Sequence, residues 1–316
     1  MKNIFLIGTG PMARDYVQVL NGLNYQFKVI GRGENSAKEF ENLTGIKPVT
    51  GGIENYVKNN RFTENSYVII ATGTQDLLKT MEAALNAGAE NVLVEKPAAL
   101  SIDELLKNKK KLTPYLNKVF IAYNRRFYAS VTEAMRMITE DGGLQSMHFE
   151  FTEWAHKIEP LEKAPGVKEN WFFANSTHVV DLAFFIAGTP VDWKTFSKPG
   201  EIKWHEKTNF AGAGITNRNV IFSYIANWES AGRWAIELLT KERRIYLKPL
   251  ESIGIQAKGT INVINHEFDD TLDRLYKPGL FMQTRAFLEN DLNSLCSLKE
   301  HFQALKNYTL ICCKNK

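Results

Sequence analysis

Short apolar runs alternate with amphipathic segments through the first 122 residues. The apolar runs predict strands at residues 2–7, 27–30, 67–71, 91–95 and 119–122. Between them, apolar residues at helical spacing predict helices around residues 16–20, 77–87 and 101–111. Strands that alternate with helices are typical of a parallel, doubly wound sheet with helices on both faces.

The pattern changes after residue 122. Residues 147–154 alternate between apolar and polar with period two, as expected for a sheet with one covered face. Further strand-like runs lie at residues 220–226, 233–239 and 244–247, and helices are predicted at residues 128–140, 178–187, 279–292 and 298–310. The predicted fold class is therefore α/β, a parallel-sheet domain followed by an α+β domain with a largely antiparallel open sheet.

Composition narrows the range of partners. The chain has a formal charge of +4 with 44% apolar and 23% charged residues, values that are ordinary for a soluble globular protein. It shows no basic stripe and no apolar run of membrane-spanning length, so neither nucleic acid nor a membrane is expected as a partner. Cys296, Cys312 and Cys313 are odd in number and lack metal spacing, which favours reduced thiols in the cytoplasm. No metal site is predicted.

A glycine-rich turn follows the first predicted strand directly, with the sequence Gly8-Thr9-Gly10-Pro11-Met12-Ala13. This is the G-x-G-x-x-A form of the dinucleotide fingerprint. Gly8 allows the tight turn, Gly10 leaves room for the pyrophosphate, and Ala13 lets the helix lie close to the strand. The sequence therefore predicts a Rossmann dinucleotide-binding domain at residues 1–122 and a substrate-binding domain at residues 123–316.

The end of the second strand bears on the choice of cofactor. Folds specific for NAD usually place an acid there, whereas this chain has Arg32, whose guanidinium can pair with a 2′-phosphate. Ser36 adds a hydroxyl, so NADP(H) is predicted to be preferred. NAD(H) stays open because Glu34 in a shifted loop could bind the ribose. The turn Ala71-Thr72-Gly73 is expected near the ribose or the nicotinamide.

Lys96 is the last side chain before a proline, at the end of the apolar strand 92–94. A lysine at the carboxyl end of a parallel strand points into the crevice where open α/β sheets bind ligands. Pro97 restricts Lys96 to extended conformations. Lys96 could instead be a solvated residue that ends the strand, but the fingerprint upstream favours a functional role.

His178 and Asp181 lie three residues apart on a predicted helix, hence on one face. A carboxylate in that position can fix the imidazole tautomer and raise its basicity. The segment 175–177 before the histidine is predicted to cap the helix. The alternative interpretation is a packed histidine with an incidental acidic neighbour.

Together these segments resemble the Gfo/Idh/MocA family of NAD(P)-dependent oxidoreductases, the relatives of glucose-fructose oxidoreductase and inositol dehydrogenase. The matching pieces are the fingerprint, Ala71-Thr72-Gly73, Glu95-Lys96-Pro97, Tyr123-Asn124-Arg125-Arg126-Phe127 and His178-Val179-Val180-Asp181. The resemblance implies hydride transfer at a carbinol carbon of a sugar or sugar derivative, such as a nucleotide or amino sugar of surface-polysaccharide biosynthesis. It also implies a Lys-Pro bond that is often cis and a homo-oligomer, dimer or tetramer, formed through the open sheet.

The resemblance assigns roles to individual residues. Lys96 matches the catalytic lysine, His178 the general acid/base and Asp181 the acid one turn further on. Many members carry an aspartate four residues before the histidine, where this chain has Ala174. The expected cofactor residues are the fingerprint residues with Arg32, Ser36, Ala71, Thr72, Gly73, Glu95 and Lys96. Besides His178, the expected substrate contacts are Tyr123, Arg126, Glu153, Trp171 and Asn175, with a core role for Trp171 equally open.

Two other functions stay open at this point. One is a glycoside hydrolase that uses bound nicotinamide for transient oxidation and elimination, as some family members do. The other is a non-catalytic NADP sensor or partner-binding protein, which the alanine at position 174 keeps in consideration.

Overall fold

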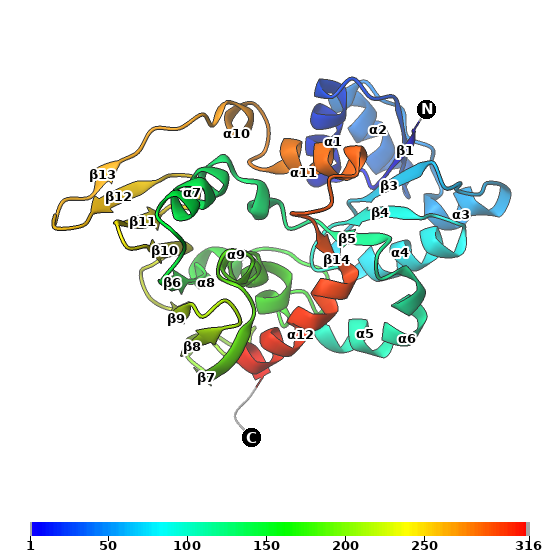
Figure 1. The fold of residues 1–316 in the computed structure, drawn as a ribbon. Coiled ribbons are helices and arrows are strands. Elements are labelled where there is room, and N and C mark those ends of the chain that lie inside the picture. The colour runs from blue at the N-terminus through cyan, green and yellow to red at the C-terminus, as the bar shows by residue number, and fades with distance from the viewer. Residues whose placement is uncertain (1, 314–316) are drawn as a thin grey trace. The chain divides into compact units, whose positions relative to one another are not determined.

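The computed structural model describes residues 2–313, with the side chain of residue 313 left out. The chain forms two compact units (Figure 1). The first contains residues up to 124 together with 275–303, and the second contains 125–274 and the residues from 304 onward. The first boundary lies two residues from the predicted one, but residues 275–303 return to the first unit instead of staying in the second domain.

The first unit is built on a six-stranded sheet with the order β14-β5-β4-β3-β1-β2. Its parallel strands are β1 (Asn3–Ile7), β2 (Phe27–Ile30), β3 (Ser66–Ile70), β4 (Asn91–Val94) and β5 (Val119–Ile121). The short β14 (Cys296–Ser297) pairs antiparallel with β5. Strands β3 and β5 are buried at every position, which explains why they appear in the sequence as continuous apolar runs.

Helices connect the strands of this unit. They are α1 (Pro11–Gly22), α2 (Glu34–Thr44), α3 (Gly52–Asn59), α4 (Leu77–Asn86), α5 (Ile102–Lys107), α6 (Lys109–Leu112) and α11 (Leu280–Glu289), with the 3₁₀ turns η1 (Thr74–Asp76) and η2 (Thr113–Tyr115). The single helix predicted at 101–111 is broken at Asn108 into α5 and α6. Ser101 begins α5, and its hydroxyl accepts a hydrogen bond from the Glu104 N–H at 3.1 Å.

The second unit contains an eight-stranded sheet with the order β13-β12-β11-β10-β6-β9-β8-β7. The strands are β6 (Ser146–Glu150), β7 (Pro190–Lys198), β8 (Asn209–Thr216), β9 (Ile221–Asn227), β10 (Ala235–Leu239), β11 (Arg243–Leu247), β12 (Gly254–Ala257) and β13 (Ile264–Asn265). Only β6 and β9 pair in parallel, so the sheet is largely antiparallel. The predicted α/β class with a second, mostly antiparallel sheet is confirmed.

Helical segments accompany this sheet. They are η3 (Asn124–Phe127), α7 (Ala129–Glu140), α8 (Ala155–Ile158), a π-helical turn η4 (Phe172–Ser176), α9 (Thr177–Ala187), α10 (Thr271–Leu275) and α12 (Leu298–Cys313). α9 is almost entirely buried and lies along β6 (Figure 1). Among residues 2–313, no helix is long and apolar enough to cross a membrane.

The strand predicted at 147–154 ends at Glu150. Phe151, Thr152 and Glu153 are all buried, so the alternation of buried and exposed side chains stops there. Strands β7 and β8 were not predicted, because β8 is rich in alanine and glycine and β7 begins at a proline. Both strands are recognisable only through their pairing with β9 and with each other.

Aromatic rings form the core of the second unit. The ring of Phe151 is fully buried, with its centroid 5.4 Å from Phe210, 5.6 Å from Phe172 and 5.7 Å from Tyr224. These rings come from β8, η4 and β9, so this one side chain joins the sheet to the helical segment that precedes α9.

We therefore expect Phe151→Ala to lower the free energy of unfolding by about 3–5 kcal/mol, because it removes a buried ring and leaves a cavity. Urea unfolding measures the change. The control Ile261→Ala alters a side chain that is 91% exposed and should change stability by less than about 0.5 kcal/mol. Equal effects of the two substitutions would contradict the assignment of this core.

Candidate cofactor and substrate sites

The glycine-rich turn has the geometry that the fingerprint predicts. Gly8 has a positive φ of 129°, and a Cβ there would lie 2.3 Å from the carbonyl oxygen of Ala71. A Cβ on Gly10 would meet nothing within 4 Å, so the space beside this backbone is open. Pro11 occupies the first turn of α1, and no side chain caps this helix within the described residues. The free N–H groups of the first turn can therefore receive a phosphate.

Strand register brings three turns to one edge of the first sheet. Ile7 pairs with Ile70, and Ile70 pairs with Val94. The residues that follow these strand ends, namely Gly8, the segment 71–73 and the segment 95–97, consequently lie along the same carboxyl edge. This edge is where open α/β sheets bind ligands.

Arg32 lies on the loop after β2 and forms an ion pair that the sequence did not reveal. Both Nη atoms are 3.1 Å from Oδ1 of Asp76, which lies in η1 after the 71–73 turn. The hydrogen bond that Arg32 donates to Asp76 raises the pKa of Arg32. The Arg32 side chain is 56% exposed, so a further anion can reach it. Ser36 donates its hydroxyl to the Gly33 carbonyl oxygen at 3.0 Å, and Glu34 begins α2.

Lys96 is partly exposed just beyond the end of β4. The Lys96–Pro97 bond is cis, as the family resemblance implied. The Glu95 N–H donates to the Ile70 carbonyl at 2.9 Å, which extends the strand pairing up to the lysine. Nε2 of the buried His301 lies 3.1 Å from the Pro97 carbonyl oxygen, so α12 also holds this turn.

Glu95 points away from solvent. Its carboxylate accepts a hydrogen bond of 2.9 Å from the hydroxyl of Tyr16, a fully buried residue of α1. Burial raises the pKa of Glu95, while the positive charge of Lys96 and the Tyr16 hydrogen bond act in the opposite direction. Burial and the nearby Glu95 also raise the pKa of Tyr16. Glu95 therefore links the fingerprint helix to the lysine turn.

His178 lies in the second unit, near the start of α9, and is buried. The predicted cap before it is wrong, because Ser176 has helical backbone angles and makes no capping hydrogen bond. A π-helical turn instead points both polar side chains at Glu153. The Ser176 hydroxyl donates to Glu153 at 2.7 Å, and the Asn175 amide lies 3.0 and 3.2 Å from its two carboxylate oxygens.

Glu153 is 1% exposed, and Arg233 is its cationic partner at 3.3 Å. Burial raises the pKa of Glu153, and the hydrogen bonds from Ser176 and Asn175 and the charge of Arg233 oppose that rise. Two of the predicted substrate contacts, Glu153 and Asn175, are thus brought together beside the helix that carries His178. The sequence could not show this because the two residues are far apart along the chain.

Asp181 and Arg126 form a buried, two-pronged ion pair. Nε of Arg126 donates to one carboxylate oxygen at 2.7 Å and Nη2 donates to the other at 2.6 Å. Their side chains are only 3–4% exposed. The structure pairs these two residues with each other. The orienting role predicted for Asp181 and the substrate contact predicted for Arg126 therefore stay predictions.

Tyr123 and Trp171, the other predicted substrate contacts, are buried. The Tyr123 ring lies 5.8 Å from His301 in the first unit. The Trp171 ring lies edge-on to Trp204, 6.2 Å away, in the second unit. These contacts give both side chains a packing role, and their contact with substrate stays a prediction.

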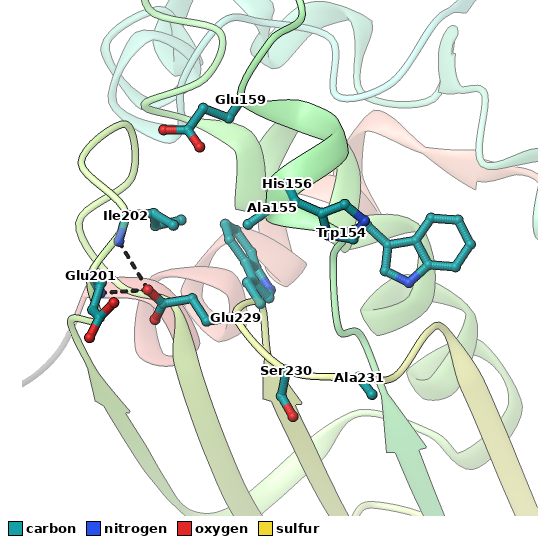
Figure 2. A pocket seen from close by; sticks show the side chains of 10 residues that line it. Trp154, Ala155, His156, Glu159, Glu201, Ile202, Glu229, Ser230 and Ala231 are labelled. Atoms are coloured by element: carbon teal, nitrogen blue, oxygen red, sulfur yellow. Dashed lines mark hydrogen bonds between the residues drawn. The ribbon is translucent and has the colours of Figure 1, made fainter.

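A cavity of about 580 Å³ opens in the second unit beside α8 (Figure 2). Its lining combines the exposed indole of Trp154 with several carboxylates and is formed by Trp154, Ala155, His156, Glu159, Glu201, Ile202, Trp228, Glu229, Ser230 and Ala231. This volume is in the range of small-molecule sites. An aromatic face with carboxylates around it suits a polyhydroxylated ligand.

Glu229 stabilises one wall of this cavity through hydrogen bonds (Figure 2). Its carboxylate accepts N–H bonds from Glu201 and Ile202, at 2.5 and 3.0 Å, and a hydroxyl bond from Thr208 at 2.8 Å. Burial acts to raise the pKa of Glu229, but these hydrogen bonds outweigh it and the pKa is lowered. A Cβ at Gly200 would come within 1.6 Å of this carboxylate, so a larger residue there would have to displace it.

In residues 2–313, no three His, Cys, Asp or Glu side chains lie close enough together to hold a metal ion. A family model described as an oxidoreductase family with an NAD-binding Rossmann fold matches residues 2–123. No curated protein sequence matches the chain.

Solved structures resemble the chain over nearly its full length. An oxidoreductase from Thermotoga maritima has a TM-score of 0.74 at 16% identity, with 98% of this chain and 95% of that chain covered. Levoglucosan dehydrogenase in complex with NADH and L-sorbose has a TM-score of 0.74 at 15% identity, with 98% and 95% covered. UDP-N-acetylglucosamine 3-dehydrogenase from Acidithiobacillus ferrooxidans has a TM-score of 0.71 at 13% identity, with 98% and 96% covered. At these identities the likeness shows a shared fold.

The raised pKa of Glu95 predicts a pH-dependent stability. The folded protein holds the Glu95 proton more tightly than the unfolded chain does, so this group destabilises the fold as the pH rises above its ordinary pKa of 4.5. We expect Glu95→Gln to become more stable relative to the wild type as the pH rises above 4.5. Urea unfolding at a series of pH values measures the difference, with Glu64→Gln, at an exposed position of the same unit, as the control. A difference between Glu95→Gln and the wild type that does not vary with pH would contradict the assignment.

Proposed function

Because residues 2–123 belong to the Gfo/Idh/MocA family of oxidoreductases with an NAD-binding Rossmann fold, we propose that the protein transfers a hydride reversibly between a nicotinamide dinucleotide and a carbinol carbon of a sugar or sugar derivative. One observation carries this proposal. Lys96 is partly exposed on the sheet edge that also bears the Gly8 turn, so an ammonium group lies on the edge where the dinucleotide binds.

In the oxidation direction, the bound nicotinamide supplies the hydride acceptor. Lys96, as ammonium, orients the substrate hydroxyl and stabilises the negative charge that develops on its oxygen. His178 accepts the hydroxyl proton, the hydride leaves the carbinol carbon with its electron pair, and a carbonyl group forms. In the reverse direction His178 returns the proton.

The proposed substrate class is a sugar, including nucleotide and amino sugars. Two proteins that share the fold are named for such substrates, levoglucosan and UDP-N-acetylglucosamine. The cavity beside Trp154 supports the same class, since sugars stack on an exposed indole and donate their hydroxyls to carboxylates.

We also propose a homo-oligomer formed through the open face of the second sheet. Phe196, Ala211 and Ile225 are register partners on β7, β8 and β9 and form one exposed row across three strands. Phe196 is 66% exposed and Ile225 50%. A contiguous apolar row of this kind is typical of an interface.

Lys96→Ala and His178→Ala are each expected to lower turnover by at least about a hundredfold while the cofactor still binds. Absorbance of reduced nicotinamide, followed with a panel of free and nucleotide sugars, measures turnover. Lys107→Ala and His266→Ala are matched controls on the surface and should leave it unchanged. Near wild-type turnover of the His178 variant would contradict the acid/base role assigned to this residue.

The same assay distinguishes the two other functions. Product formation without net cofactor turnover would indicate a hydrolase, and cofactor binding without any turnover would indicate a sensor.

We propose that NADP(H) is preferred over NAD(H), with Arg32 as the group that selects the 2′-phosphate. Loss of a charge-assisted hydrogen bond corresponds to about 1.5–3 kcal/mol, so Arg32→Ala should weaken NADP(H) binding by about tenfold or more and leave NAD(H) binding nearly unchanged. Isothermal titration with both cofactors measures the effect, and the exposed Arg61→Ala is the control. Equal or tighter NAD(H) binding that Arg32→Ala does not alter would contradict the preference.

A further inference from the structure

Two consecutive arginines in η3 have opposite environments. Arg126 has both oxygens of Asp181 as partners. Within residues 2–313, no hydrogen bond or ion pair joins the half-buried guanidinium of Arg125 to another group, and its Nε is buried without an acceptor. Burial lowers the pKa of Arg125, whereas Tyr128, Glu251 and Glu153 act to raise it without a hydrogen bond to the guanidinium. A guanidinium whose N–H groups have no acceptor is costly to a fold, which makes it a candidate for binding an anion.

Arg125 belongs to a stack of cations and rings. Its Cζ lies 4.5 Å from the ring centroid of the buried Trp234, and the Cζ of Arg233 lies 4.5 Å from the same ring. Arg233 also lies 4.7 Å from the ring of Trp154, which lines the cavity in Figure 2. Stacking on an aromatic ring fixes the plane of each guanidinium and leaves its N–H edge available for a bidentate contact.

The two guanidiniums on Trp234 differ in their pairing. Arg233 lies 3.3 Å from the carboxylate of Glu153, which also receives hydrogen bonds from Ser176 and Asn175. Glu251 and Glu153 both attract Arg125, but neither is hydrogen-bonded to it. The N–H groups of Arg125 are therefore available to an anion. The Arg233 side chain is 41% exposed, so an ion can enter from solvent.

The ring of His178 lies 6.1 Å from the ring of Trp234. The stacked guanidiniums are thus next to the side chain that the proposed function makes the acid/base. A substrate whose hydroxyl reaches His178 would have its neighbouring substituents near the guanidiniums.

We propose that Arg125 and Arg233, stacked on Trp234, form a subsite for a carboxylate or phosphate group of the substrate. This inference rests on the proposed function and narrows its substrate class to anionic sugars, either sugar acids or sugars that carry a phosphate. Both groups present two oxygens in the geometry that a guanidinium edge binds in a bidentate manner.

Titration calorimetry with D-glucuronate, D-glucose 1-phosphate and neutral D-glucose tests the subsite, at matched ionic strength, with and without NADP⁺. We expect the wild type to bind one anionic sugar at least about tenfold more tightly than D-glucose, and Arg125→Met to lose that preference. Whichever anion is preferred identifies the carboxylate or the phosphate as the natural group. Arg136→Gln removes an exposed arginine that pairs with Glu133 and Glu140, and it should keep the preference.

Thermal unfolding of the same variants excludes a merely structural role. Without anion, Arg125→Met should unfold at the same or a higher temperature than the wild type, because a guanidinium without a hydrogen-bonded acceptor is removed. The anionic sugar that binds should raise the unfolding temperature of the wild type and not that of the variant. If Arg125→Met fails to fold, Arg125→Lys replaces it, since lysine keeps the charge but loses the bidentate edge, and it too should lose most of the preference.

An absent preference in the wild type, or one that survives in the folded Arg125 variant, would overturn the subsite. Because binding is measured apart from turnover, the two proposals can fail separately. Hydride transfer on neutral sugars with no anion preference would remove only the subsite. Anion binding that depends on Arg125, without turnover on any sugar, would remove only the proposed reaction.

Discussion

The parallel register of β1, β3 and β4 is the constraint on which the first unit depends. Since Ile7, Ile70 and Val94 are neighbours across the sheet, three turns that are far apart in sequence end at one edge. The contact between Gly8 and the Ala71 carbonyl is a direct result, because these two backbones approach too closely for any Cβ. A shift of one residue in this register would turn the side chains of the shifted strand to the opposite face of the sheet.

Buried carboxylates show how each unit holds its polar groups in place. Glu95 accepts a hydrogen bond from Tyr16 and has a raised pKa, whereas Asp181 is paired with both donor atoms of a guanidinium edge. Glu153 lies between these cases, with a hydroxyl, an amide and a partly exposed arginine around it. The three carboxylates thus differ in how completely hydrogen bonds and positive charges compensate for their burial. Glu153 also shows that Ala174 does not leave this region without an acid, because the carboxylate comes from the segment after β6 instead.

The sequence predicted the parts of the fold that local patterns determine. The apolar runs of β1 to β5 and the glycine turn were found because burial on both faces and a tight turn leave a direct signature. Strands β7 and β8 were missed because their stability comes from pairing across the sheet and not from their own residues. The same reason applies to the candidate site residues. Lys96 and His178 stand out locally, but the pairs Arg32–Asp76 and Glu153–Arg233 form only through tertiary folding.

Arg125 and Arg126 give the sharpest example of this limit. In sequence they are adjacent and chemically identical, and the resemblance to a family singled out only Arg126 for contact with substrate. In the folded unit, Arg126 is paired with Asp181, while Arg125 is stacked on Trp234 without a hydrogen-bonded carboxylate. A guanidinium whose N–H groups are already bonded has little left for a ligand, whereas one whose N–H groups have no acceptor can gain one from an anion. The two adjacent arginines therefore differ in what they can offer a ligand only because tertiary folding gives one of them a carboxylate partner.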